Sequence, residues 1–492
     1  MSSVAPVNRE GLVHSMLSRF SPVHLAVFAS VLLSLIAIVG AGIVGRDGAF
    51  YLDIARQVSL QGPQVALQLF DWPWFSMLLA ATHEVSGLSL ELCAYVWSVV
   101  FMAATAGLMV DCVRQRWPQA AWWACLVVLA MPAVNVFRYD IIREHGFWFF
   151  CTLALWLAMR WEQRGGWGLV VAIYLSIFAA MLFRLEAAML VVALAFWQLP
   201  ELFRAAKRRR ALQFFAVPLL LAIPVVAILA PRIDVHSGRI AYLWTLLEPS
   251  SVFASFNRLS AQFGDSLVNK YSVGESGRII FFGMLAALVI KFVSMAGPFM
   301  APLLLARQWR AWAVYWRLFQ PLAWAAGGYL VVLMLFFVNA QFMNGRYLSL
   351  LNLLVVPLLA VLLWQFAQAF PRLGKLIAAI GLLVMVSNVV SLGAPKTHFI
   401  AAGHWMAEHV DAQAPVYYED GRISWYAGRG YPPPTLPREA AMAPGVAQQY
   451  RYFVLEAEPQ EPWLQAWLAE HGQRVLAQFA NRKGKTVTVV GP

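Results

Sequence analysis

Long apolar runs alternate with short charged segments over most of the chain. The first run covers about residues 22–44, and ten more follow before residue 394. Most runs are close to the roughly 20 residues that a helix needs to cross the hydrocarbon core of a bilayer. We therefore predict a polytopic α-helical membrane protein with about eleven transmembrane helices, the other ten at 91–111, 120–137, 147–160, 167–183, 186–203, 212–230, 280–304, 318–338, 348–369 and 376–393.

Basic residues gather in every second loop of this pattern. Cytoplasmic loops of membrane proteins carry an excess of Lys and Arg, so these loops predict which side is cytoplasmic. The N-terminus falls on the cytoplasmic side and, with an odd number of spans, the C-terminus falls outside. The basic loops contain Arg114 and Arg116; Arg160 and Arg164; Arg204 and Lys207–Arg210; Arg307, Arg310 and Arg317; and Arg372 and Lys375.

Two regions outside the spans have a pattern of their own. In the first outer loop, residues 45–90, the spacing of Phe50, Ile54 and Val58 predicts a short amphipathic surface helix, and Trp72–Trp74 begins another. From about Lys396 the apolar runs shorten and turn formers appear. This change predicts a small C-terminal α/β domain, with strands at 415–418, 451–455 and 486–490 and helices at 398–410 and 462–471.

Composition supports the membrane assignment and narrows the function. The 492 residues are 61% hydrophobic and 13% charged, whereas soluble domains are nearer half apolar and a quarter charged. The formal net charge of +12 lies mostly in the basic loops, so it indicates topology rather than nucleic-acid binding. The four cysteines form no CxxC pair and lie in or beside apolar runs, which indicates neither a disulfide nor a metal site.

Charged residues of both signs occur at four places on the expected outer side. Charges at membrane depth are costly and are usually paired, cavity-facing or functional, so the four places predict a polar cavity at the outer leaflet. No Walker A, GxGxxG or HExxH motif accompanies them. The four places are Asp47; Arg138–Asp140 with Arg143, Glu144 and His145; Arg184 with Glu186; and Asn344 with Arg346 and Tyr347.

These motifs, in this order, resemble the polyprenyl-phosphate-dependent glycosyltransferases of the GT-C superfamily, which include lipid A aminoarabinose transferases, protein O-mannosyltransferases and rhizobial lipopolysaccharide transferases. In that family an acid after the first span opens a D-x-x-x-Y-x-x-x-A pattern, here Asp47, Tyr51 and Ala55. The family has an acid after the third span, here Glu144. Its R-x-E element matches Arg184 and Glu186, and its Arg-Tyr element matches Arg346 and Tyr347. Departures are Gly48 where a second acid is common, Glu144 in place of Asp, and Trp72–Trp74 in place of Lys-Pro-Pro.

The resemblance implies transfer of a sugar from a polyprenyl-phosphate donor to a hydroxyl of a periplasmic glycan, lipid or protein, by a multi-pass protein of the bacterial inner membrane. Asp47 is the expected base, and a single attack would invert the anomeric centre; Glu144 is the second expected catalytic residue. Arg184, Arg346, Arg143 and Tyr347 are expected to bind the donor phosphate, and Tyr51, Asp140, His145 and Glu186 to contact sugar or acceptor. The expected domains are a cytoplasmic tail at 1–21, a catalytic membrane domain at 22–393 and a periplasmic domain at 394–492.

Several alternatives remain open at the level of sequence. A lipid-linked sugar transporter or flippase, a ligase or oligosaccharyltransferase moving whole glycans, and a silent scaffold are the competing functions. No His and carboxylate spacing favours a metal, so no cofactor is expected, although a divalent ion stays open. Asp53 and Arg56 favour a local ion pair, Lys291 suits either snorkelling or lipid phosphate, and Glu419, Asp420 and the aromatic residues near them favour an exposed surface over a glycan site.

Overall fold

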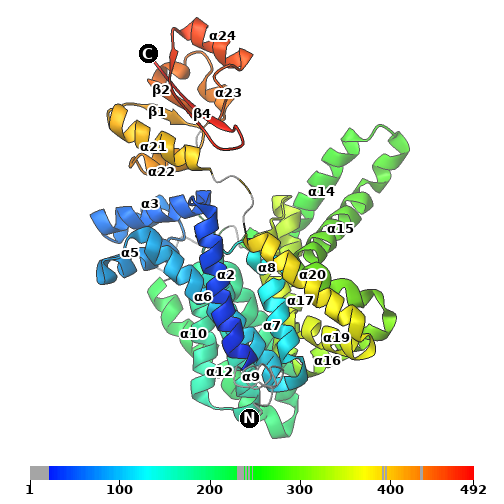
Figure 1. The fold of residues 1–492 in the computed structure, drawn as a ribbon. Coiled ribbons are helices and arrows are strands. Elements are labelled where there is room, and N and C mark those ends of the chain that lie inside the picture. Colours follow the sequence, from blue (N-terminus) through cyan, green and yellow to red (C-terminus); the bar gives the residue numbers. More distant parts are fainter. Residues whose placement is uncertain are drawn as a thin grey trace, which may run out of the picture. The chain divides into compact units, whose positions relative to one another are not determined.

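The computed structural model describes residues 21–229, 248–390, 396–432 and 436–492, together with residues 238, 241, 244, 245 and 393. Nearly all of the expected N-terminal tail, and part of the loop 231–279, lie outside these residues. The chain divides into two compact units (Figure 1). The first, here the membrane unit, contains 99–138 and 143–389 with the start of the first helix; the second, here the loop–sheet unit, contains 35–98, 139–142 and 390–492.

Helices occupy all eleven stretches that the apolar runs predict. Two of the runs form more than one helix. The third run forms a helix followed by a second, short helix, and the tenth run forms two helices. The helices are α2 (Pro22–Ala41), α6 (Leu90–Arg116), α7 (Ala121–Ala130) with α8 (Pro132–Asn135), α9 (Glu144–Arg164), α10 (Trp167–Phe183), α11 (Met189–Gln198), α12 (Ala205–Leu229), α15 (Ser276–Ala296), α17 (Gln320–Ala340), α18 (Gly345–Leu354) with α19 (Val356–Ala369), and α20 (Pro371–Val389). The described residues of the membrane unit also include α14 (Pro249–Ser266) and α16 (Arg310–Leu318), which lie between these runs.

Within the described residues, six helical segments are long and apolar enough to cross a membrane, and the α18–α19 pair, bent by 60°, would make a seventh. The expected count of eleven also includes α7, α9, α10 and α12, which do not pass that criterion. The α7 and α10 segments are short, at 118–130 and Trp167–Phe183, and α9 carries four charged residues among its 21. The chain is a polytopic helical membrane protein in which several helices are shorter or more polar than a simple span.

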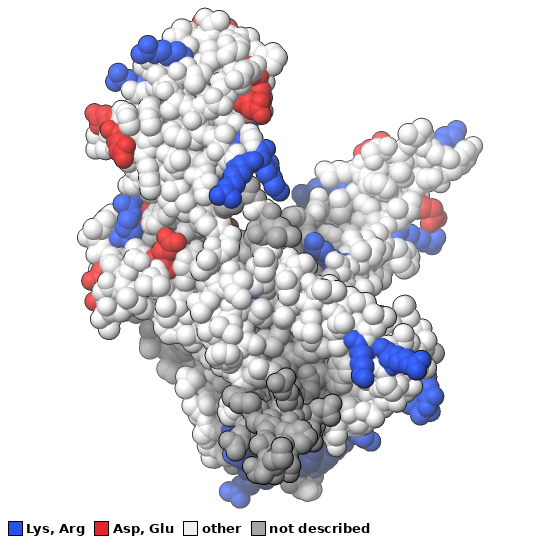
Figure 2. Space-filling view, viewed as in Figure 1, with Lys and Arg blue, Asp and Glu red and all other residues white. Residues whose placement is uncertain are grey.

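Charge is unevenly distributed over the membrane unit. Figure 2 shows Lys and Arg side chains concentrated around α16, α19 and α20, with hardly any Asp or Glu visible there. Arg307 lies in the 3-10 helix η6 (Ala306–Trp309) before α16, Arg310 is the first residue of α16, and Arg372 and Lys375 lie near the start of α20. The hairpin of α14 and α15, in contrast, carries both signs. This asymmetry is the one on which the predicted orientation depends.

The first loop of the loop–sheet unit contains three helices. They are α3 (Arg46–Gln61), α4 (Gln64–Leu69) and α5 (Trp74–Ser86), so both predicted surface helices are present and a third lies between them. An aromatic cluster joins them: the ring centroids of Phe50 and Phe70 are 5.1 Å apart, and those of Tyr51 and Phe75 are 5.4 Å apart. The buried residues of α3 include Leu52, Ile54, Ala55 and Val58, so this helix packs within the unit as well as being amphipathic.

The C-terminal part is a small sheet with helices on both faces. Its strands are β1 (Val416–Tyr418), β2 (Tyr452–Leu455), β3 (Arg474–Ala480) and β4 (Thr486–Gly491), in the order β1-β2-β4-β3. The β1 and β2 strands are parallel, and the other neighbours are antiparallel. Three strands and both helices, α21 (Thr397–His409) and α24 (Pro462–His471), match the prediction; β3, α22 (Gly421–Tyr426) and α23 (Arg438–Ala441) were not predicted.

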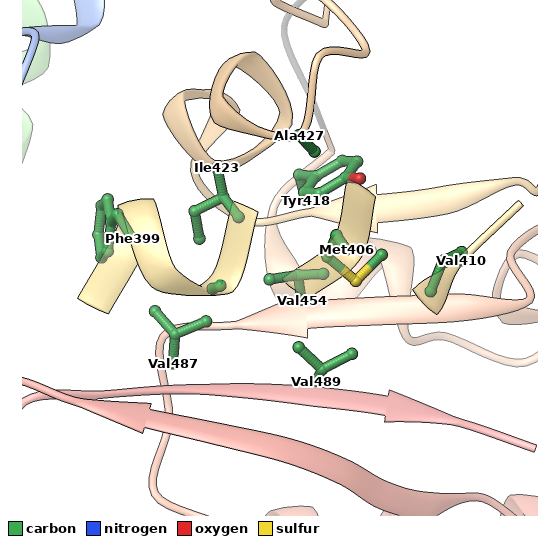
Figure 3. Packing of buried hydrophobic residues seen from close by; sticks show 10 residues of the cluster. Phe399, Met406, Val410, Tyr418, Ile423, Ala427, Val454, Val487 and Val489 are labelled. Carbon is green, nitrogen blue, oxygen red and sulfur yellow. The ribbon is translucent and has the colours of Figure 1, made fainter. Parts of the chain in front are cut away.

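Alternating side chains give this sheet two cores. Tyr418, Val454, Val487 and Val489 face α21 and α22, as Figure 3 shows, and pack on Phe399, Met406 and Ile423. Tyr417, Phe453 and Val490 point the other way and pack against Leu464 and Leu468 of α24. Because successive residues of a strand point to opposite faces, short runs such as Tyr417–Tyr418 fill both cores.

Candidate functional site

A buried ion pair is the centre of the polar cluster in the membrane unit. Glu144 is the first residue of α9, and Arg184 follows the last residue of α10. The Arg184 Nη1 atom donates to Glu144 Oε1 at 2.7 Å, and the two side chains are only 9% and 3% exposed. Gly146 makes this approach possible, because a Cβ there would overlap the ring of Phe183, the residue before Arg184.

The R-x-E element, Arg184 with Glu186, adds a second carboxylate to the same guanidinium. Arg184 has an extended backbone, and a 3-10 turn, η2 (Leu185–Ala188), follows it. This turn brings the Glu186 carboxylate to Arg184, with Nη2 donating to Oε1 at 2.6 Å. Arg184 therefore lies between two carboxylates, and the structure brings together two places that are 40 residues apart in sequence.

Arg346 and Tyr347 complete the cluster from the start of α18. Arg346 Nε lies 3.6 Å from Glu144 Oε1, and the Arg184 guanidinium lies 4.7 Å above the Tyr347 ring. Asn344 caps α18 by accepting the Arg346 backbone N–H, and Tyr329 of α17 donates its hydroxyl hydrogen bond to the Tyr347 carbonyl. Arg346 is 24% exposed, so it is the more accessible of the two arginines on Glu144.

Lys291 of α15 reaches the same helix end. Its Cε atom lies 3.5 Å from the position of a Cβ on Gly345, the residue before Arg346. Because Gly345 has no side chain, the lysine stem passes close to the α18 backbone. Two cations from different helices therefore lie at one helix N-terminus, where the helix dipole also favours an anion.

Three neighbours expected at the site are deeply buried. Arg143 precedes α9 and is 8% exposed. His145 is 1% exposed, and its Nε2 atom lies 3.1 Å from the Phe137 carbonyl, to which it donates. Arg138, at 0% exposure, donates to Asn135 and to Ser30 and Ser34 of α2, so the structure places it in helix packing rather than in the Glu144 cluster.

Asp47 lies in the first turn of α3, in the loop–sheet unit. The spacing of Asp47, Tyr51 and Ala55 places all three along one strip of this helix. Asp47 is partly buried and interacts electrostatically with Tyr431 of the C-terminal part. Tyr51 is 6% exposed and belongs to the aromatic cluster, and Asp140 Oδ1 would be 3.1 Å from a Cβ on Gly45, directly before α3.

Asp420 is not the surface acid that its sequence context favours. Its side chain is 0% exposed and accepts from two arginines. Arg46 donates to Oδ2 from Nε at 3.0 Å and from Nη2 at 2.8 Å. Arg422 donates to Oδ1 from Nε at 2.9 Å and to Oδ2 from Nη2 at 2.7 Å. The local Asp53–Arg56 pair, in contrast, is present as expected, at 2.9 Å.

Acid should weaken the loop–sheet unit through Asp420. Burial alone would raise the pKa of this carboxyl, but hydrogen bonds and charge from Arg422 and Arg46 outweigh burial and lower it to about 2. A carboxyl with a lowered folded-state pKa stabilises the protein above its unfolded pKa near 4 and loses that contribution as pH falls toward 2. We expect a loss of about 2 kcal/mol of folding stability over this interval.

The measurement is denaturant unfolding of the full chain in detergent between pH 6 and pH 2.5. Asp420→Asn should remove most of the pH-dependent difference, whereas Asp411→Asn, at an exposed acid, should leave it in place. An identical pH dependence in wild type and Asp420→Asn would contradict the assignment.

Sequence reasoning did not connect Arg46 with Asp420 and Arg422. The only signal was the Asp–Gly–Arg run itself, since Asp is a favoured N-cap and Asp420 does cap α22. Its partner Arg46 is 374 residues away. The distance explains why no local pattern revealed the contact.

The described residues contain no group of three or more His, Cys, Asp or Glu side chains able to hold a metal ion. In the membrane cluster, Glu144 and Glu186 both face Arg184. The Arg184 guanidinium therefore lies between these two carboxylates.

Comparison with known proteins identifies the fold. No protein-family model and no curated protein sequence matches the chain. Among solved structures, ArnT from Cupriavidus metallidurans bound to undecaprenyl phosphate has a TM-score of 0.60 at 13% identity, over 95% of this chain and 97% of that chain. The same protein in the apo state has a TM-score of 0.58 at the same coverage.

A second relative comes from archaea. The Archaeoglobus fulgidus oligosaccharyltransferase, in complex with Zn and sulfate, has a TM-score of 0.58 at 13% identity, over 95% of this chain and 73% of that chain. ArnT and this enzyme are both members of the GT-C superfamily, to which the sequence motifs pointed. The chain therefore has the GT-C fold, shared over nearly its whole length with ArnT and with the archaeal oligosaccharyltransferase.

Proposed function

We propose that this protein is a membrane glycosyltransferase that moves a sugar from a polyprenyl-phosphate donor to an acceptor hydroxyl. The observation that carries the proposal is the cluster of Glu144, Arg184, Arg346 and Tyr347, formed by three separate segments of a GT-C fold. Charges buried in a membrane protein are costly, and those that are present are usually paired and mark a site of binding, transport or catalysis. ArnT, a lipid A aminoarabinose transferase of the same fold, binds undecaprenyl phosphate.

The proposed base is Asp47. An attacking hydroxyl must lose its proton as its oxygen bonds to carbon, and a carboxylate within hydrogen-bond reach of that hydroxyl can accept the proton. The hydroxyl oxygen forms the new bond to the anomeric carbon, the bond from that carbon to the phosphate oxygen breaks, and the lipid phosphate leaves with the electron pair. One displacement inverts the anomeric centre.

The membrane cluster is proposed to bind the leaving phosphate and orient the reactants. Arg346 is the principal phosphate ligand because it is partly exposed and has a planar fork of donors. Arg143 adds positive charge, and Tyr347 supports Arg184 through its ring. Arg184 holds Glu144 and Glu186 in place, and Glu144 Oε2, which has no hydrogen-bond partner among the described residues, can accept from a substrate hydroxyl.

Lys291 is proposed as a second phosphate ligand. Its stem lies against Gly345, directly before Arg346, so its ammonium can approach an anion held by Arg346. We expect Lys291→Met to weaken binding of undecaprenyl phosphate about 10-fold, since charge-assisted hydrogen bonds contribute roughly 1.5–3 kcal/mol.

Binding of undecaprenyl phosphate in detergent measures this effect directly, without turnover. Lys291→Arg should retain most of the affinity, and Lys270→Met, which removes an exposed lysine just before α15, should leave it unchanged. Equal affinity of Lys291→Met and wild type would exclude the lysine from the site.

We propose that transfer needs no divalent metal, because a guanidinium lies between the carboxylates of the cluster. Treatment with EDTA should therefore leave the rate within about twofold, where loss of a Lewis-acid contribution would remove several kcal/mol. A large loss, restored by adding back Mg²⁺, Mn²⁺ or Zn²⁺, would contradict this; the archaeal relative was crystallised with Zn.

The proposed location is the bacterial inner membrane, with the N-terminus in the cytoplasm and the domain at 394–492 in the periplasm. The basic segments around α16 and α20 support this orientation through the positive-inside rule. The acceptor is then a periplasmic glycan, lipid or protein. Labelling of single cysteines by an impermeant thiol reagent in intact cells would test it, with sites in the C-terminal sheet expected to react.

The deciding experiment is transfer by purified protein from a panel of undecaprenyl-phosphate sugars: a hexose, an aminodeoxypentose and a hexuronic acid. Loss of one sugar from cell-surface glycans on deletion, measured by mass spectrometry, would identify the acceptor. NMR of the product should show inversion, and net retention would contradict the single-displacement mechanism.

Transfer of a whole glycan is the second candidate, because the archaeal oligosaccharyltransferase shares the fold. A multi-sugar donor active where the single-sugar panel is inactive would favour it. Movement of lipid-linked sugar across proteoliposomes without transfer would instead favour a transporter.

A further inference from the structure

Residues of the C-terminal domain contact the start of α3. Its N-cap is Gly45, which makes no side-chain capping hydrogen bond. The first residues of α3 are Arg46 and Asp47, so an unfixed first turn would leave the proposed base without a defined position. Helix ends fray when their terminal groups lack partners.

One short helix of the C-terminal domain, α22, holds both sides of Gly45. At its N-terminus, the buried Asp420 accepts two hydrogen bonds from Arg46. At its C-terminus, the Tyr426 hydroxyl accepts the backbone N–H of Val44 at 2.9 Å. The two contacts lie on either side of the N-cap and fix the entry into α3.

The helix α22 is itself rigidly supported. Arg422 holds Asp420 by three hydrogen bonds, one from its backbone N–H, and its guanidinium lies 4.8 Å over the Phe399 ring of α21. Gly403 of α21 lets the helices meet closely, because a Cβ there would lie 2.9 Å from the Ile423 carbonyl oxygen. Ile423 and Phe399 belong to the core that covers the sheet, so the sheet supports α22 and α22 supports α3.

We propose that the C-terminal domain is a positioning part of the transferase, in which Asp420 and Tyr426 hold Arg46 and Val44 and so set the orientation of Asp47. The proposal rests on the proposed function, since it takes Asp47 to be the base. It gives the domain a part in the rate of reaction besides any part in acceptor binding. Arg46, Asp420 and Tyr426 are positioning residues that touch neither substrate nor reacting atoms.

The test compares Arg46→Met, Arg46→Lys and Tyr426→Phe with a matched control, Arg438→Met. Arg438 forms an ion pair with Glu419 in the same domain, at 2.5 Å, and its hydrogen bonds go to Glu419 and to the Glu456 carbonyl, which lie outside α3. The full-length proteins are assayed with the donor found active in the panel, and undecaprenyl phosphate binding is measured separately.

We expect Arg46→Met to lower kcat about 10- to 100-fold, because misplacing a catalytic group by about 1 Å can cost 10²-fold. Donor KM and undecaprenyl phosphate affinity should stay unchanged. Arg46→Lys should recover part of the loss, and Tyr426→Phe, which removes one hydroxyl and is the less disruptive change, should lower kcat several-fold. Arg438→Met should leave kcat unchanged.

A double-mutant cycle separates positioning from general damage. If Arg46 acts through Asp420, then Arg46→Met in an Asp420→Asn background should lower kcat little further. Additive losses, an equal loss in Arg438→Met, or unchanged kcat in both Arg46→Met and Tyr426→Phe would overturn the proposal. Failure of the proposed function is a different result: Asp47→Asn would then transfer sugar at the wild-type rate.

Discussion

Asp47→Asn is expected to abolish transfer while leaving the protein folded and inserted. The amide has nearly the shape of the carboxylate but cannot take a proton, so kcat should fall by about 10²–10⁴, the range of general acid–base contributions. Asp47 lies in the first turn of α3 and is partly buried, so replacing it disturbs little packing. Turnover with the active donor and the yield of folded protein from size-exclusion chromatography are the two measurements.

The matched control is Glu84→Gln, which neutralises an exposed carboxylate on α5 of the same unit. It should keep wild-type turnover. Binding of undecaprenyl phosphate should be equal in Asp47→Asn and wild type, because the phosphate ligands are proposed to lie in the membrane unit. Wild-type turnover by Asp47→Asn would remove this residue from the mechanism.

Arg184→Met is expected to have the largest effect on folding. The Arg184 guanidinium bonds to Glu144 and Glu186, and the Glu144 side chain is only 3% exposed. Removing the cation would leave the buried Glu144 carboxylate with only the longer contact to Arg346, at 3.6 Å, and loss of one partner of a buried pair costs about 3–5 kcal/mol. The folded fraction in detergent should fall, and the midpoint of unfolding by a denaturing detergent should shift down.

Arg204→Met is the control for this change. Arg204 pairs with Glu201, but its side chain is 64% exposed, and exposed pairs contribute about 0–1 kcal/mol. The double change Glu144→Leu with Arg184→Met should recover part of the stability, since it removes both members of the buried pair. Normal stability of Arg184→Met alone would show that the ion pair does not hold the helix ends together.

The likeness to solved transferases and the sequence motifs lead to the same fold by separate routes. The likeness rests on backbone coordinates over 95% of the chain at only 13% identity. The motif argument rests on a few side chains, of which Glu144, Arg184 and Arg346 prove to be neighbours in space. Agreement between them is the reason to test sugar transfer before transport.

The sequence determined the helices of this protein and most of its C-terminal sheet. Runs of apolar residues indicate helices because each must bury its own backbone polar groups in a membrane, which a helix does locally. Strand β3 was missed because its residues are half-buried or exposed, so no buried apolar run marks it, and its pairing depends on β4. The Arg184–Glu186 ion pair is also a local feature of the sequence, because the two residues contact each other across a single turn.

Tertiary structure decided which charges meet and which are buried. Glu144 receives Arg184 only because α9 and α10 pack together where Gly146 leaves room for Phe183. Arg138 is an arginine like Arg184 and lies near Glu144 in sequence, yet its side chain donates hydrogen bonds to α2 instead. The buried Asp420 accepts hydrogen bonds from Arg422, two residues later, and from Arg46, 374 residues earlier. Such contacts depend on which helices are neighbours, and no local pattern of residues encodes that.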